Sequence, residues 1–113
     1  MNFKNETIKV ILDSGRKEED VMFIGTDDGL HRTTMEDFKA WSNFEYDSGL
    51  GSEKIPPNLI IYFKDEAYIK RGEYDGSEWW EYNEPLKFKK ENSFKIFKLK
   101  KTDAFGEYEV TER

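Results

Sequence analysis

The stretch NLIIYFKDEAYIKRGEYDGSEWWEY, residues 58–82, decides the fold of this chain. Its runs at 58–65, 67–74 and 78–82 are rich in β-branched and aromatic residues, a composition typical of β-strands. Asp65-Glu66 forms a tight turn between the first two runs. Asp75-Gly76, a strong hairpin-turn signal, separates the last two. The stretch therefore predicts a three-stranded antiparallel meander at the centre of the domain.

Two helices are predicted on the amino-terminal side of the meander. Asn5 is a candidate N-cap for a short helix that ends near Gly15, although the β-branched residues of this stretch also permit a strand. Thr34, with Asp37 three residues later, resembles a capping box and predicts a second helix. The apolar residues of that second helix, expected to form its buried stripe, are Met35, Phe38 and Trp41.

Further strands are predicted on both sides of the meander. An apolar run at 21–24 followed by Asp28-Gly29 predicts a hairpin. Residues 86–101, LKFKKENSFKIFKLKK, alternate lysine with apolar residues, and GEYEVTE at 106–112 is able to close the sheet. We therefore expect an α+β fold in a single domain, residues 1–113, with one or two short helices on an antiparallel sheet of about four to six strands.

Composition excludes several kinds of protein. The chain has 113 residues, which suits one domain, and no cysteine, so it forms neither disulfides nor thiolate metal sites. No apolar stretch is long enough to span a membrane, and no secretory signal is visible at the amino terminus. We therefore expect a location in the cytoplasm and no membrane partner. The nine phenylalanines, six tyrosines and three tryptophans favour a folded domain over a disordered chain.

Charge is distributed unevenly along the chain. The formal net charge is −6, yet residues 86–113 hold 8 basic against 5 acidic residues. An acidic body therefore carries a basic segment. Lysines interleaved with aromatic residues can bind single-stranded nucleic acid, but lysines on an edge strand also prevent sheet-to-sheet aggregation. Because the net negative charge of the chain repels phosphate, we favour the interpretation that these lysines protect an edge strand from aggregation. We therefore expect no direct binding of nucleic acid.

The sequence contains few residues that are candidates for catalysis. His31 is the single histidine, and no neighbouring acid is singled out to orient it. No phosphate-binding glycine loop is present, and the Asp-Gly turns at 27–29 and 75–78 lack the ligand spacing of a calcium loop. We therefore expect no enzyme, no cofactor and no metal site.

Glycoside hydrolysis is a weak alternative. It would draw its two acids from Glu73, Asp75, Glu78 and Glu81, beside the neighbouring aromatic residues. Such hydrolysis needs two acids at a set separation across a cleft. In a strand, however, Glu78 and Glu81 face opposite sides. The same alternation places Trp79 and Trp80 on opposite faces, so one of them is expected in the core.

A resemblance adds context to these patterns. GRKEEDVMFIGTDDG, EYDSGLGSEKI, FKIF and the opening stretch, above all EYDGSEWWEY at 73–82, resemble small uncharacterised proteins of phages, prophages and mobile elements of Gram-positive bacteria. The resemblance covers about residues 6–97 and brings no catalytic or ligand-binding residue with it. It implies an accessory gene on mobile DNA, a setting in which small acidic proteins are often antagonists of host defence, including anti-CRISPR proteins. It also implies that the cytoplasm is that of the bacterial host.

The function expected from these observations is inhibition of a host defence protein by direct binding. Carboxylates on a rigid surface can occupy a groove built for phosphates, and exposed Trp or Tyr beside them strengthens binding. The loop at 45–58 and the acidic and aromatic residues of the central hairpins are the expected surface. The candidate residues are Asp27, Asp28, Glu45, Tyr46, Asp47, Glu73, Tyr74, Asp75, Glu78, Trp79 and Trp80. A CRISPR nuclease or another nucleic-acid-binding protein is the expected partner.

Two other functions remain open from the sequence. A small-molecule or nucleotide-signal binding protein would use the lysine-rich segment 86–101 and its aromatic residues. An enzyme acting on carbohydrate or nucleic acid has the least support, because the sequence singles out no catalytic group.

Overall fold

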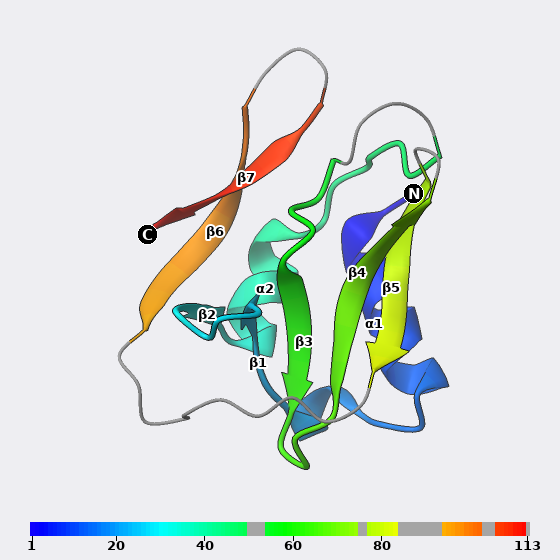
Figure 1. Ribbon diagram of the computed structural model, residues 1–113, viewed down its shortest axis with the longest axis vertical. Coiled ribbons are helices and arrows are strands. Elements are labelled where there is room, and N and C mark those ends of the chain that lie inside the picture. Colours follow the sequence, from blue (N-terminus) through cyan, green and yellow to red (C-terminus); the bar gives the residue numbers. More distant parts are fainter. Residues whose placement is uncertain (50–53, 75–76, 84–93, 103–105, 113) are drawn as a thin grey trace.

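A computed structural model describes residues 1–49, 54–74, 77–83, 94–102 and 106–112, and it confirms the α+β class (Figure 1). Within these residues, two α-helices and a 3-10 helix accompany one seven-stranded sheet. The helices are α1 (Phe3–Asp13), η1 (Glu18–Asp20) and α2 (Met35–Trp41). The sheet therefore has one strand more than the upper end of the range expected from the sequence.

The strand order across the sheet is β5-β4-β3-β1-β2-β6-β7. The strands are β1 (Val21–Thr26), β2 (His31–Thr33), β3 (Leu59–Phe63), β4 (Tyr68–Tyr74), β5 (Ser77–Asn83), β6 (Lys95–Lys101) and β7 (Tyr108–Glu112). The predicted meander, β3–β4–β5, forms one flank of the sheet, and β1 lies at its centre. All neighbours are antiparallel except β2 and β6, which run parallel. The lysine-rich β6 is second from the edge, not the edge strand that the sequence suggested.

Local sequence explains the helix ends. Asn2, not Asn5, is the N-cap of α1, because its side chain accepts a hydrogen bond from the Asn5 backbone N–H at 2.9 Å. Gly15 follows the helix with φ +83°, a conformation that glycine adopts without strain. The predicted cap of α2 is confirmed, since Thr34 accepts a hydrogen bond from the Asp37 backbone N–H at 3.0 Å.

The main core lies between the sheet and the helices, which share one face of the sheet (Figure 1). Phe3 of α1 and Phe38 of α2 are fully buried, and their rings meet edge to face at 5.4 Å between centroids. They pack with Ile61 of β3, Trp80 of β5 and Phe97 of β6. A single apolar cluster therefore links both flanks of the sheet. None of the helices in the described ranges is long and apolar enough to cross a membrane.

The opposite face of the sheet has a smaller apolar cluster. Phe23, Ile60 and Tyr62 are at most 4% exposed, and Tyr68 packs against them. Neither α1 nor α2 contributes a residue to this cluster. The two faces of the sheet therefore differ, since the helices pack on only one of them.

Candidate interaction surface

The predicted binding residues gather at one end of the sheet. Strand pairing sets this arrangement: Tyr74 at the end of β4 faces Ser77 at the start of β5. The turn after β1 lies at the same end, where the backbone N–H of Asp27 donates to the carbonyl of Asn58 at 2.8 Å. The segment 45–49 lies beside β5, because the N–H of Glu78 donates to the carbonyl of Ser48 at 2.7 Å.

Five of these residues form an exposed group that we call the acidic end surface: Glu45, Asp47, Glu73, Tyr74 and Trp79. Tyr74 is 77% exposed and Trp79 is 36% exposed. The three acidic side chains are exposed as well. Large amphipathic rings such as those of Tyr74 and Trp79 are the kind of side chain enriched at the energetic centre of protein interfaces.

Trp79 owes its orientation to Gly72 on the neighbouring strand. The two residues are paired across β4 and β5, and a Cβ atom on Gly72 would lie 2.8 Å from the indole nitrogen. That nitrogen donates a hydrogen bond to the Glu81 carboxylate at 3.2 Å. The absence of a side chain on Gly72 therefore lets the indole lie close over β4.

Trp80 points to the other face, so the predicted split of the two tryptophans is confirmed. It is 6% exposed and stacks on Phe3 with ring centroids 5.9 Å apart. Its indole nitrogen donates to the Thr7 hydroxyl of α1 at 2.9 Å. Trp80 is a core residue that fixes α1 on the sheet, and its ring does not lie on the surface that a partner would meet.

Glu78, expected on the binding surface, is also buried, with a residue exposure of 4%. Its carboxylate accepts hydrogen bonds from the backbone N–H groups of Lys54 at 2.6 Å and Ile55 at 3.0 Å. It also lies 3.1 Å from a terminal nitrogen of Arg71, whose side chain is 1% exposed. Glu78 therefore ties residues 54–55 to the β4–β5 hairpin, because a buried carboxylate needs these partners.

Tyr46 extends the same buried network and is 7% exposed. Its hydroxyl accepts a hydrogen bond from Arg71 at 3.1 Å and donates a short one to the carboxylate of Glu6 in α1. Burial raises the pKa of the Tyr46 phenol above its usual value, with Glu6 adding to that effect and Arg71 opposing it. Tyr46 therefore stays protonated and holds the 45–49 segment against the core.

Arg71 and Glu6 are the residues of this network that sequence reasoning missed. Arg71 alternates with the buried Ile69 on β4, so it occupies an inward position of the predicted meander. A two-residue turn at 75–76 implies that Arg71 faces Trp80 and lies on the same side as Glu78. That signal was present in the sequence. In contrast, no residue pattern in the hairpin predicts that Glu6, in the distant helix α1, takes part in this network.

Three further candidates are Asp27 and Asp28 in the turn after β1, and Asp75, which lies outside the described residues. Asp28 accepts hydrogen bonds from the Thr26 hydroxyl at 2.6 Å and the Leu30 N–H at 2.9 Å, which lower the pKa of its carboxyl. Asp27 lies 3.8 Å from the ammonium of Lys70. Asp75 falls in a part of the chain that the structure does not describe.

The single histidine takes part in a charge cluster between β2, β6 and β7. His31 Nε2 lies 3.7 Å from an oxygen of Glu112, and the ammonium of Lys95 lies 3.0 Å from the same oxygen. Lys95 and, more weakly, His31 lower the pKa of the Glu112 carboxyl. Among the described residues, no group of three potential ligands is placed to hold a metal ion.

Comparison of the chain with protein-family models, with curated proteins and with solved structures finds no match.

Proposed function

We propose that this chain is a non-enzymatic accessory protein of a phage or mobile element that binds and inhibits a host defence protein. The observation that supports this best is the exposure of Tyr74 and Trp79 on one face of the β4–β5 hairpin, where the Trp79 indole nitrogen donates to the Glu81 carboxylate. Solvent-exposed rings flanked by carboxylates are unusual on a surface that serves only solubility.

The buried network beneath this surface supports a binding role. Arg71 and Glu78 lie on the inner face of the hairpin that presents Tyr74 and Trp79. Arg71 also bonds to Tyr46, and Glu78 bonds to the backbone of residues 54–55. A surface that is rigid before binding loses less entropy when a partner docks. The geometry therefore suits a preformed protein interface.

The charge of the chain indicates the kind of partner. With a net charge of −6, the protein is attracted to basic grooves. Carboxylates of the acidic end surface would occupy positions that phosphates take in such a groove, and the rings would supply the desolvated contact. A CRISPR nuclease, or another nucleic-acid-binding defence protein, has a groove of this kind.

Plasmid interference in a host with an active CRISPR nuclease tests this proposal. The chain should restore transformation by a targeted plasmid, and the double variant Tyr74→Ala/Trp79→Ala should lose that effect. Tyr82→Ala is the matched control, because Tyr82 is 53% exposed and paired with Ile69, away from the turn. Each variant's folding should be checked by thermal unfolding.

A purified panel of nucleases completes the test. Wild-type protein should compete with guide or target nucleic acid, with an affinity that falls as salt rises, because the contacts are ionic. The proposal fails if wild-type protein binds no nuclease of the panel and protects no targeted plasmid. It also fails if the double variant protects as well as the wild type.

A further inference from the structure

On the inner face of the β4–β5 hairpin, which packs against α1, an arginine lies between a tryptophan and a carboxylate. The guanidinium carbon of Arg71 lies 4.8 Å from the ring centroid of Trp80, and a terminal nitrogen of Arg71 lies 3.1 Å from the Glu78 carboxylate. Glu78 and Trp80 are two residues apart on β5, and Arg71 is the partner of Trp80 on β4. This side of the hairpin therefore holds an arginine by a cation–π contact and an ion pair together.

The outer face of the same hairpin has the tryptophan and the carboxylate but no arginine. Trp79 and Glu81 are also two residues apart on β5, and strand alternation places both on the face opposite Trp80. The residue that pairs with Trp79 on β4 is Gly72, which has no side chain. The outer face therefore presents the two kinds of group that hold Arg71 on the inner face, and β4 supplies no cation opposite the indole.

The Trp79 ring is positioned before any partner arrives. It lies close over the β4 backbone, because a Cβ atom on Gly72 would be 2.8 Å from the indole nitrogen. That nitrogen donates to the Glu81 carboxylate at 3.2 Å, and the Trp79 side chain is still partly exposed. Part of the indole therefore stays open to solvent, with a carboxylate held beside it.

The Glu81 carboxylate forms no ion pair with a described residue. Lys70 lies directly across from Glu81 on β4, yet its ammonium is 3.8 Å from the Asp27 carboxylate in the turn after β1. Within the described ranges, the Trp79 indole is the one group that donates to the Glu81 side chain. A guanidinium suits this position, because it stacks on a ring and donates to a carboxylate in the same plane.

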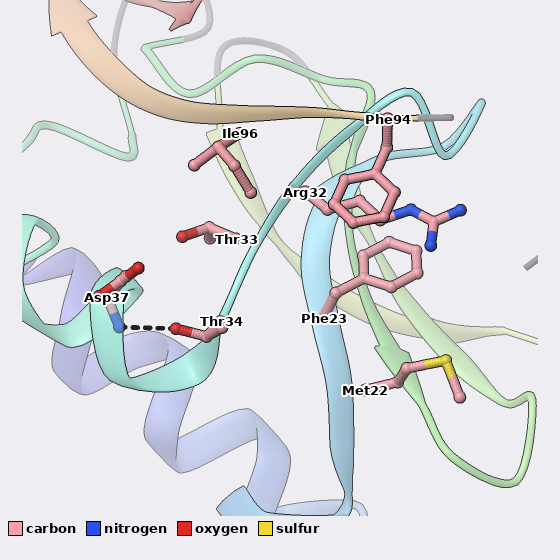
Figure 2. Close-up of a pocket in the computed structure, with 8 residues that line it drawn as sticks. All are labelled: Met22, Phe23, Arg32, Thr33, Thr34, Asp37, Phe94 and Ile96. Carbon is pink, nitrogen blue, oxygen red and sulfur yellow. Dashed lines mark hydrogen bonds between the residues drawn. The ribbon is translucent and has the colours of Figure 1, made fainter. Parts of the chain in front are cut away.

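Arginine also stacks on aromatic rings elsewhere on the face of the sheet that α1 and α2 leave open. Figure 2 shows the Arg32 side chain beside the rings of Phe23 and Phe94, and its guanidinium carbon lies 4.6 Å and 4.4 Å from their centroids. Contacts between arginine and aromatic rings therefore occur on both faces of this sheet, with Trp80 on the inner face and with the two phenylalanines on the outer face.

We propose that the outer face of the β4–β5 hairpin binds an arginine side chain of the partner protein, with the guanidinium on the Trp79 ring and paired with Glu81. This inference rests on the proposed function and deepens it, because it names the group that this face recognises. Arginine is favoured over lysine, whose ammonium is a compact and strongly hydrated charge that does not stack. The net charge of −6 adds a long-range attraction for either cation. Tyr74 is exposed and diagonal to Trp79 across the two strands, so it adds contact area.

Indole N–H NMR on the isolated full chain tests the proposal without a nuclease. The probes are glycine-flanked tripeptides whose central residue is arginine, lysine or citrulline, the neutral isostere of arginine. In low-salt buffer we expect the arginine peptide to shift the Trp79 indole signal with a Kd on the order of 10 mM. The lysine peptide should bind several-fold more weakly and the citrulline peptide more weakly still. The indole signals of Trp41 and Trp80, the other two tryptophans, should stay unchanged.

Two variants with the same change of charge isolate the role of Glu81. Glu81→Gln keeps an oxygen that accepts from the Trp79 indole and removes the negative charge, so it should weaken the arginine peptide about threefold. Glu36→Gln, in α2 on the opposite face of the sheet, should leave its affinity unchanged. An unchanged Trp79 signal with the arginine peptide overturns the proposal. So does a lysine or citrulline peptide that binds as tightly, or a Glu81→Gln variant with wild-type affinity.

The plasmid interference assay keeps this inference distinguishable from the proposed function. If the chain protects a targeted plasmid and the arginine peptide leaves the Trp79 signal unchanged, arginine recognition fails and inhibition stands. If the arginine peptide binds as expected and the chain neither protects the plasmid nor binds a nuclease, arginine recognition is supported and the proposed function fails alone.

Discussion

The guanidinium of Arg71 and the carboxylate of Glu78 lie 3.1 Å apart behind the β4–β5 hairpin, with both side chains 1% exposed. Removing one partner would leave the other charge buried and unpaired. We expect Glu78→Ala to lower the free energy of unfolding by about 3–5 kcal/mol, measured by urea denaturation. Glu81→Ala, an exposed acid three residues away, should change it by less than about 0.5 kcal/mol. Similar values for both variants would contradict the role given to Glu78.

The two adjacent tryptophans should respond differently to the same substitution. Trp80→Phe removes a buried hydrogen bond to Thr7 and part of the core packing, so we expect a loss of about 1–3 kcal/mol in unfolding free energy. Trp79→Phe affects a partly exposed ring and should cost less than about 0.5 kcal/mol. Urea denaturation monitored by circular dichroism compares them. A larger loss for Trp79→Phe would reverse the assignment of the two faces.

Gly25 is required by the close approach of β1 and β2. A Cβ atom at this position would lie 2.0 Å from the His31 carbonyl oxygen, so the strands would have to separate. We expect Gly25→Ala to destabilise the protein by about 3 kcal/mol or to prevent folding, seen as a lowered Tm or insoluble protein. Gly49→Ala is the matched control, since its nearest atom would be 3.8 Å away. Equal Tm values for the two variants would show that the strands tolerate the added methyl group.

Because of Asp28 in the turn after β1, the free energy of unfolding should depend on pH in acidic solution. Hydrogen bonds from Thr26 and Leu30 lower the pKa of Asp28 below its ordinary value of 3.8. The stabilising contribution of Asp28 is therefore complete above pH 3.8 and is lost as pH falls through the lowered folded-state pKa. The difference in unfolding free energy between wild type and Asp28→Asn should therefore shrink as the pH falls from 3.8 through the lowered pKa of Asp28. Carboxyl NMR titration checks the pKa directly, and a value at or above 3.8 would contradict the prediction.

Much of the fold follows from short-range patterns. Runs rich in β-branched and aromatic residues predict strands at 58–65, 67–74 and 78–82, and all three are present. The turn at Asp65-Glu66 is confirmed, with Glu66 at φ +75°, and so is the turn at Asp28-Gly29, with Gly29 at φ +74°. The strands and the glycine turn depend on dihedral preferences of neighbouring residues, which the sequence contains directly, whereas Glu66 adopts a positive φ against its own preference.

The interaction surface was predicted only in part. Glu73, Tyr74 and Trp79 are exposed as expected, whereas Tyr46, Glu78 and Trp80 are buried. Alternation shows which residues share a face of a strand but not which face a helix will cover. An acidic residue is usually expected to be exposed. Glu78 is buried instead, because the buried Arg71 pairs with its carboxylate.

The sequence by itself determined the α+β class, the cap of α2, the turns at Asp28-Gly29 and Asp65-Glu66, and the separation of Trp79 from Trp80. Each of these depends on residues close together in the chain. Only the tertiary structure decided the parallel pairing of β2 with β6 and the network from Glu6 to Glu78. Those features join segments more than sixty residues apart or lie between strands whose order no local pattern encodes, so long-range packing had to establish them.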